Sequence, residues 1–165
     1  MQTKITGRVW KYGDDVNTDV IFAGKYTYSI TDPKEMAQHA LEDLDPTFVQ
    51  NVRPGDIIVA GKNWGCGSSR EQAVVCLKEL GIGALVARSF ARIYFRNCIN
   101  YALPIVTCDA VDGVTSGDEI TIDFEAGVVH TPAGEYTFPP MPAEVLGILE
   151  AGGLIPYVRK QLGIA

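Results

Sequence analysis

A glycine-rich segment that carries two hydroxyls and an arginine is the part of this chain best suited to chemistry. It reads Gly65-Cys66-Gly67-Ser68-Ser69-Arg70-Glu71 and lies between an apolar run at residues 56–60 and an amphipathic run at residues 70–80. We expect a strand and a helix on either side of it. A turn in this position directs main-chain N–H groups and the positive end of a helix toward one point. Such a turn could hold a carboxylate or phosphate and move a proton beside it.

Three known glycine-rich motifs fit this segment poorly. A dinucleotide-binding fingerprint needs a third glycine where Arg70 stands. The lysine of a phosphate-binding loop is absent, and a serine-hydrolase turn does not continue with Ser69 and Arg70 after Ser68. A fourth interpretation is structural, with a serine that caps the helix. A cap does not need Arg70, and the glycines beside Cys66 indicate a close approach to the backbone, so binding and capping both stay open.

The composition is that of an acidic globular protein. The chain has 165 residues, of which 47% are hydrophobic and 21% charged, enough for the core of one domain over residues 1–165. The formal net charge is -6, which disfavours a nucleic-acid surface because phosphate binding needs clustered Lys and Arg. No apolar run approaches the ~18 residues of a membrane helix, and the first residues lack a signal-peptide core.

The cysteines favour a reducing compartment. Their spacing includes no C-x-x-C pair, since they stand at Cys66, Cys76, Cys98 and Cys108. We therefore expect reduced thiols in a cytoplasmic protein. Neither histidine has ligand spacing, so we expect no metal site made by this chain alone.

Alternating strands and helices in the middle of the chain predict parallel βαβ units. Short apolar runs occur at residues 56–60, 84–87 and 105–108, and helical segments at 70–80 and 90–101 separate them. Further along, alternating runs bounded by turn residues predict antiparallel hairpins. These runs cover residues 119–124, 127–130 and 135–138. The remaining expected elements are a strand at 5–10 and helices that start at Asp32 and that cover 141–151 and 155–162. The fold class is thus α/β, with parallel βαβ units and additional short antiparallel strands.

Four motifs together resemble one protein family. They are Asn17-Thr18-Asp19, the glycine-rich segment 65–71, Ser89-Phe90-Ala91-Arg92-Ile93 and Gly152-Gly153-Leu154. In this order they resemble the small subunits of 3-isopropylmalate dehydratases, within the aconitase superfamily. The resemblance covers nearly the whole chain and implies a single-domain swivelling β/β/α fold. It also implies a hydro-lyase that interconverts 2-isopropylmalate and 3-isopropylmalate by dehydration and rehydration, a step of leucine biosynthesis.

The resemblance further implies a partner chain. A large subunit would carry a [4Fe-4S] cluster, whose open iron acts as Lewis acid on the leaving hydroxyl. The present chain would then bind no cofactor itself. It would be active only in a heterodimer or heterotetramer with that subunit, on a small hydroxy-dicarboxylic acid.

By the same resemblance, Ser68 is the catalytic base and Arg70 binds a substrate carboxylate through two hydrogen bonds. Asp19 matches the T-D-x-I motif of the family and is expected at the same site as a second catalytic residue. A serine is a poor base in water, so we expect help from the N–H groups of Ser69 and Arg70 in a closed, water-free site. The Ser69 hydroxyl either binds substrate or caps the helix.

Four other motif residues have structural alternatives. Arg92 either touches the site or forms an ion pair within the domain. Asn17 and Thr18 either support the site or only shape a turn. Cys66 has no nearby histidine in the sequence, so we expect a small packed residue and not a nucleophile.

The loop at residues 23–29 departs from isopropylmalate enzymes. Those commonly read P-A-R-Y-L where this chain reads A-G-K-Y-T, and Gln72 stands where histidine is frequent. The resemblance places three loop residues near the variable part of the substrate: Lys25, Tyr26 and Thr27. A hydroxyl at Thr27 finds no partner on an isopropyl group, so 2-methylmalate, 2,3-dimethylmalate and homoaconitate are alternative substrates. Gly24 favours a hinge-like loop.

A non-catalytic role is the alternative from another functional class. The same turn could make the chain a carboxylate-binding module that regulates a partner. Binding by such a module would survive Ser68→Ala and need no cluster, whereas a hydro-lyase subunit requires Ser68 strictly.

Overall fold

Strand β1 (Lys4–Lys11) joins a parallel and an antiparallel half into one seven-stranded sheet, ordered β4-β3-β2-β1-β5-β6-β7. The computed structural model describes residues 3–164, so Met1, Gln2 and Ala165 of the predicted domain lie outside the described residues. The C-terminal part of β1 pairs in parallel with β2, from Val9–Ile57 to Lys11–Val59. Its N-terminal part pairs antiparallel with β5, beginning at Lys4–Asp123.

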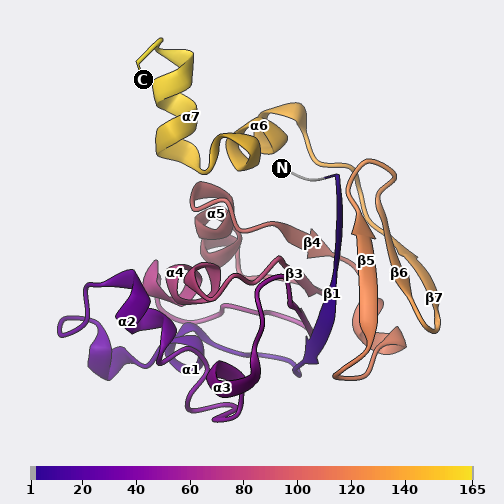
Figure 1. Ribbon diagram of the computed structural model, residues 1–165, viewed down its shortest axis with the longest axis horizontal. Helices are drawn as coiled ribbons and strands as arrows, with labels where there is room; N and C mark the ends of the chain where they lie inside the picture. The colour runs from indigo at the N-terminus through magenta and orange to yellow at the C-terminus, as the bar shows by residue number, and fades with distance from the viewer. Residues whose placement is uncertain (1–2, 165) are drawn as a thin grey trace.

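The parallel half follows the predicted βαβ pattern (Figure 1). Its strands and crossover helices are β2 (Ile57–Ala60), α4 (Gln72–Glu79), β3 (Ala84–Ala87), α5 (Arg92–Asn100) and β4 (Ile105–Thr107). The hairpins are also confirmed, as β5 (Glu119–Asp123), β6 (Val128–Thr131) and β7 (Gly134–Thr137). The other elements are α1 (Thr18–Ile21), η1 (Gly24–Tyr26), α2 (Pro33–Ala37), α3 (Phe48–Asn51), η2 (Ala110–Gly113), α6 (Ala143–Ala151) and α7 (Leu154–Gln161).

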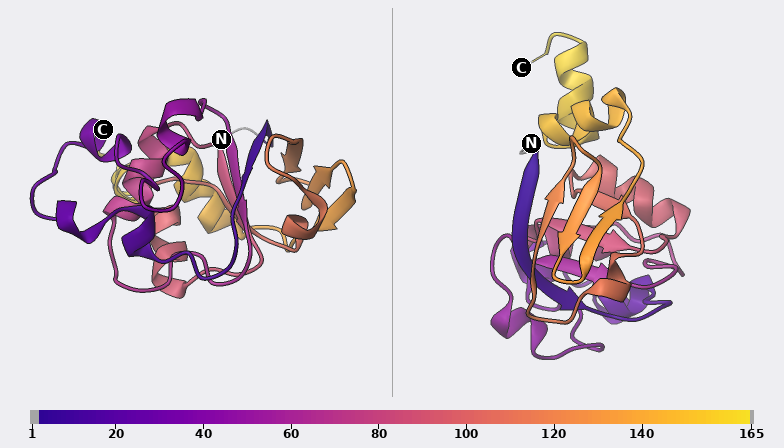
Figure 2. Two further views of the ribbon diagram at one scale, coloured as in Figure 1. Left: turned by 90° about the horizontal axis from the view of Figure 1, so that it is seen from below. Right: turned by 90° about the vertical axis from the view of Figure 1, so that its right-hand side faces the viewer.

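Strand β2 is buried on both faces, which explains its unbroken apolar sequence. Ile58 and Ala60 pack into the core under the helices, whereas Ile57 and Val59 pack into a second core against the antiparallel strands. Because successive side chains point to opposite faces, one strand serves both cores. The layers are helices, parallel strands and antiparallel strands (Figure 2), so the predicted β/β/α arrangement is confirmed.

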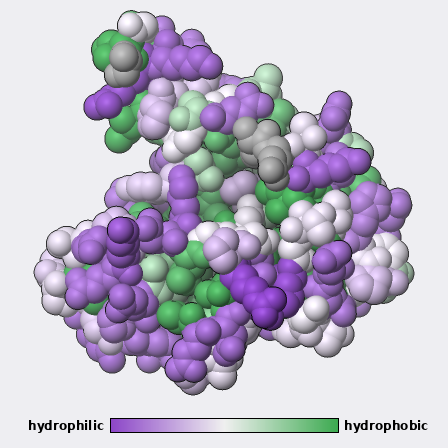
Figure 3. Space-filling model, in the orientation of Figure 1, coloured by the Kyte–Doolittle hydropathy of each residue, from purple (hydrophilic) through white to green (hydrophobic). Residues whose placement is uncertain are grey.

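Helix α7 packs loosely at the end of the molecule. It has no buried residue and contacts α6 and α5 (Figure 1). Two of its apolar side chains, Ile155 and Leu162, are both 68% exposed. Hydrophobic atoms are visible on the surface at this end of the molecule (Figure 3). No helix among residues 3–164 is long and apolar enough to cross a membrane.

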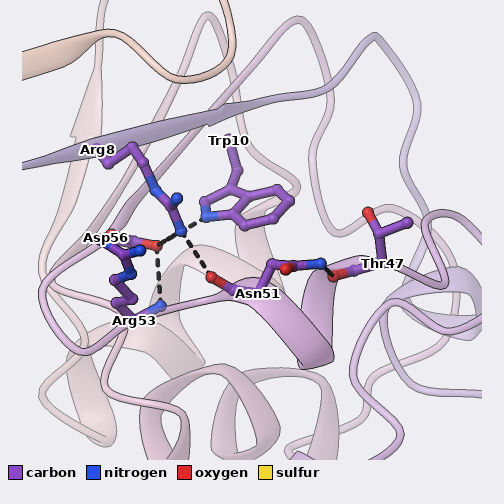
Figure 4. A network of polar contacts seen from close by, with 6 residues as sticks. All are labelled: Arg8, Trp10, Thr47, Asn51, Arg53 and Asp56. Atoms are coloured by element: carbon purple, nitrogen blue, oxygen red, sulfur yellow. Dashed lines mark hydrogen bonds and ion pairs between the residues drawn. The ribbon is translucent and has the colours of Figure 1, made fainter.

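A buried carboxylate fixes the start of β2 against β1 (Figure 4). Asp56 is 4% exposed and accepts hydrogen bonds from Trp10 Nε1 at 2.9 Å, Arg53 N at 2.9 Å and Arg8 Nη2 at 3.0 Å. Burial alone raises the pKa of this carboxyl, but these three donors outweigh burial and the pKa is lowered. The group therefore stabilises the fold as a carboxylate.

We predict that Asp56→Ala lowers the free energy of unfolding by about 2–4 kcal/mol, because three donors lose a buried acceptor. Urea denaturation of the isolated chain at neutral pH would measure this loss. The contribution of Asp56 is present above its unfolded pKa of about 3.9 and disappears as the pH falls through the lower folded pKa.

A matched control is Glu135→Ala, which removes an exposed pair with His130 and should cost no more than ~1 kcal/mol. Equal stability of the Asp56 and Glu135 variants would contradict the role given to the buried network.

Candidate active site

Segments that follow three neighbouring parallel strands meet at one end of the sheet. The Gly65 N–H donates to Val16 O at 2.8 Å, and the Thr18 N–H donates to Cys66 O at 2.8 Å. The Ala91 N–H donates to Trp64 O at 2.9 Å, which ties the segment after β3 to the one after β2. Ligands of open α/β sheets bind beyond the carboxyl ends of the strands, where these segments lie.

A pocket of about 270 Å³ opens at this meeting point. It is lined by the glycine-rich turn, by the buried Thr18 and by the first residues of α5. The lining residues are Thr18, Gly65, Gly67, Ser68, Ser69, Arg70, Ala91, Arg92, Ile93, Tyr94 and Asn97. The structure thus brings together three segments that lie far apart in the sequence: Thr18, residues 65–70 and residues 91–97.

The close approach expected at the glycines is made by a protein side chain. A Cβ at Gly65, where φ is +82°, would lie 2.2 Å from Tyr94 Cγ. The buried Tyr94 hydroxyl donates to Ala73 O at 2.8 Å, and burial raises its pKa well above the usual value. Tyr94 is therefore a neutral floor beneath the turn, and glycine at position 65 is needed for its packing.

Neither serine caps α4, so the capping interpretation is wrong. The helix starts at Gln72, two residues later than predicted, and Glu71 occupies the N-cap without a side-chain capping bond. Ser68 and Ser69 are both exposed in the pocket wall. Among residues 3–164, no atom accepts a hydrogen bond from the Ser69 or Arg70 N–H. Both amides are therefore open to a ligand, although they precede the helix and do not belong to its first turn.

Arg70 is held in place by one of its nitrogens. Its Nη1 donates to Asp19 Oδ1 at 2.9 Å and to Phe22 O at 3.3 Å. The Gly24 N–H donates to the same Asp19 oxygen at 2.8 Å. Hydrogen bonding from Arg70, and then from Gly24, lowers the pKa of Asp19. Asp19 is therefore an anion near neutral pH that orients Arg70.

The other edge of this guanidinium is open. Within the part of the chain that the structure describes, Arg70 Nε and Nη2 donate to no protein atom. These two donors form one edge of the planar group and match the two oxygens of a carboxylate. Arg70 is therefore oriented by Asp19 and free to bind an anion.

Asn17 and Thr18 have distinct structural positions. Asn17 caps α1, and its Oδ1 accepts from the Val20 N–H at 2.9 Å. Thr18 is 2% exposed, and its hydroxyl donates to Ser68 O at 2.8 Å. Asn17 thus shapes a helix start, and Thr18 contacts the turn directly.

Cys66 and Arg92 lie beside the site in different ways. Cys66 is half-buried and contacts α1 through its main chain. Arg92 is exposed and lines the pocket. It forms no ion pair with any residue from 3 to 164, so the predicted alternative of an internal ion pair is wrong.

Asp19, which reaches the site through Arg70, and three loop residues expected near the substrate do not line this pocket. Lys25 Nζ lies 3.9 Å from Glu42 Oε1, and the Tyr26 ring lies 4.2 Å from the ring of His39. Thr27 ends η1, where its N–H donates to Gly24 O. The structure thus directs this loop toward α2 and the residues after it.

The described residues hold no metal-binding cluster. No group of three or more His, Cys, Asp or Glu side chains is placed to hold an ion among residues 3–164. The cysteines are all free thiols, and burial raises the pKa of Cys76, Cys98 and Cys108.

Comparison with known proteins identifies the family. The aconitase C-terminal domain family matches residues 15–109, which include the turn, Asp19 and Arg92. A 3-isopropylmalate dehydratase small subunit from Heliobacterium modesticaldum is 48% identical over 96% of this chain and 97% of its own length. The chain belongs to the family of 3-isopropylmalate dehydratase small subunits. A second relative, 3-isopropylmalate dehydratase small subunit 1 of Archaeoglobus fulgidus, is 48% identical over 93% of the chain and 96% of its own length.

Solved structures agree with this family assignment. A 3-isopropylmalate dehydratase structure from Methanocaldococcus jannaschii superposes with a TM-score of 0.91 at 42% identity, covering 96% of this chain and 95% of that one. Aconitase X of Thermococcus kodakaraensis superposes with a TM-score of 0.52 at 17% identity, covering 82% of this chain and 90% of that one. The second match shows a shared fold.

Three residues of α5 that line the pocket were not predicted from the sequence. Ile93, Tyr94 and Asn97 all line it from α5. A signal was present, since residues three and four apart share a helix face, and Asn97 stands three residues after Tyr94 and four after Ile93. The floor formed by Tyr94 was missed because its contact with Gly65 is distant in sequence.

Gly24 supplies a test of the Asp19–Arg70 arrangement. A Cβ there would lie 2.7 Å from Asp19 Oδ1 and 2.9 Å from both Arg70 Nη atoms. These atoms end flexible side chains, so we predict that Gly24→Ala displaces the pair at a cost in stability below ~1 kcal/mol. In the assembled enzyme, substrate KM should rise about tenfold, because a displaced arginine loses a charge-assisted bond.

Gly13→Ala is the matched control, since a Cβ at Gly13 meets no atom within 4 Å. Steady-state kinetics of both variants would measure the change in KM, and thermal melts would measure the change in stability. An unchanged KM in Gly24→Ala would contradict the role given to the ion pair.

Proposed function

We propose that this chain is the small subunit of a hydro-lyase that interconverts 2-isopropylmalate and 3-isopropylmalate in leucine biosynthesis. The observation that carries the proposal is the open edge of Arg70 beside the exposed Ser68 in one pocket. The small-subunit names of relatives that are 48% identical support the same reaction.

We assign substrate binding to Arg70. Its Nε and Nη2 would donate to one carboxylate of the acid, with Asp19 holding the opposite edge of the guanidinium. Ser69 would contact the same carboxylate from the turn. The exposed Arg92 at the pocket wall adds a second positive charge for the other carboxylate.

We assign proton transfer to Ser68. Its Oγ, deprotonated in the closed complex, would remove the proton α to a carboxylate and return it during rehydration. The N–H groups of Ser69 and Arg70 would stabilise the serine oxyanion, because they donate to no described protein atom. This help is needed because an isolated serine is too weak a base.

A large subunit completes the proposed enzyme. It would supply the [4Fe-4S] cluster that binds the leaving hydroxyl, and it would close the pocket against water. The assembly would be a heterodimer or heterotetramer in the cytoplasm, in keeping with the four free thiols.

The loop residues complete the proposed substrate contacts. Lys25 is paired with Glu42 at 3.9 Å, and its side chain is 64% exposed. Such an exposed pair contributes little, so Lys25 could leave it at low cost when substrate and partner arrive. Lys25, Tyr26 and Thr27 would then contact the substituent that distinguishes isopropylmalate from its analogues.

The test is turnover by this chain after anaerobic reconstitution with its large subunit. The acids to compare are 2-isopropylmalate, 2-methylmalate, 2,3-dimethylmalate and homoaconitate. We predict the highest kcat/KM for 2-isopropylmalate. We also predict that Ser68→Ala lowers kcat at least ~10²-fold, whereas the neighbouring control Ser69→Ala lowers it less than ~10-fold.

The outcomes separate the possible functions. Preference for another acid would change the substrate and keep the reaction class. Full activity of Ser68→Ala would remove Ser68 as base. Carboxylate binding without turnover, in a cluster-loaded complex, would instead favour the regulatory module.

A further inference from the structure

We propose that Thr18 is a positioning residue that fixes the main chain of Ser68 and thereby aims the catalytic turn. The inference rests on the proposed role of Ser68 as base. Thr18 reaches the turn from α1, far from it in the sequence.

Two hydrogen bonds from Thr18 span the turn. Its hydroxyl donates to Ser68 O at 2.8 Å, and its N–H donates to Cys66 O at 2.8 Å. Gly67 lies between these two carbonyls with φ of +96°. Glycine leaves the turn great conformational freedom, so the two bonds at its ends are what hold it in one conformation.

The geometry of the peptide bond transmits this effect to the site. The Ser68 C=O and the Ser69 N–H belong to one planar trans peptide, and they point in opposite directions. Holding the Ser68 carbonyl toward Thr18 therefore directs the Ser69 N–H away from Thr18. That N–H donates to no atom of residues 3–164 and is one of the two donors proposed for the serine oxyanion.

Thr18 is itself held rigidly. It is 2% exposed, and its carbonyl accepts from the Phe22 N–H at 2.9 Å. Asn17 caps the same short helix, and Ile21 and Phe22 are fully buried. The turn is therefore anchored to the helical core through the hydroxyl and the main-chain N–H of one buried residue.

The decisive variants are Thr18→Val and Thr18→Ser in the complete enzyme. Valine keeps the size of threonine and removes the donor, whereas serine keeps the donor. We expect Thr18→Val to lower kcat by ~10-fold or more, since small displacements of reacting groups reduce rates strongly. KM should stay within ~3-fold because Arg70 is held independently by Asp19. Thr18→Ser should recover most of the lost kcat.

Asp56→Asn, which removes a buried charge and one acceptor oxygen, controls for disturbance of a buried polar network away from the turn. Asp56 and Thr18 are the buried polar or charged residues of the described chain, and Asp56 hydrogen-bonds to residues of β1 and of the turn before β2. Asp56→Asn should leave kcat unchanged. An equal fall in kcat for Asp56→Asn, wild-type kcat for Thr18→Val, or failure of serine to rescue would each overturn the proposal.

A readout without substrate separates this inference from the proposed function. In the isolated chain, NMR order parameters of the Gly67 and Ser69 amides should be about 0.85 in wild type and Thr18→Ser, and below about 0.6 in Thr18→Val. Equal order in all three proteins would overturn the anchor even if the enzyme is active. The expected pattern would support the anchor even if isopropylmalate is not the substrate.

Discussion

The site depends on main-chain hydrogen bonds between segments that follow neighbouring parallel strands. Val16 O receives the Gly65 N–H, and Trp64 O receives the Ala91 N–H. These bonds use backbone atoms, so they set the position of the turn whatever side chains line the pocket. The side chains proposed for binding and proton transfer then extend from a frame fixed by the sheet, which is the preorganisation that catalysis requires.

Opposing requirements act on the few residues around Arg70. For the proposed binding role, the guanidinium must be held firmly enough to have one orientation, yet keep an edge free for a ligand. Asp19 meets both needs by binding Nη1 alone, and Gly24 leaves the space that a side chain would fill. The pair is exposed enough, with Asp19 at 64%, that it contributes little to stability. The ion pair with Asp19 instead fixes the orientation of the Arg70 guanidinium.

The sequence predicted the elements better than the contacts between them. Uninterrupted apolar runs such as residues 57–60 predicted buried strands. A strand that is buried on both faces has no solvent-exposed positions for polar residues. The turn was predicted because closely spaced glycine, serine and arginine residues indicate an anion-binding turn from the sequence alone. The floor formed by Tyr94 and the late start of α4 were not found, because they depend on packing between segments distant in the chain. The orientation of the Lys25 loop toward Glu42 likewise has no local signal.

The dual pairing of β1 has a consequence for how the chain acquires its structure. Its first strand residue, Lys4, pairs with Asp123, so β1 cannot complete its antiparallel pairing until β5, much later in the chain, has been synthesised. Loop closure over such a separation is entropically costly, and folds dominated by distant pairings form slowly. Until β5 arrives, one edge of β1 stays unpaired, and an open strand edge invites association with other chains. We therefore expect the nascent chain to depend on chaperone protection until its antiparallel half has been synthesised.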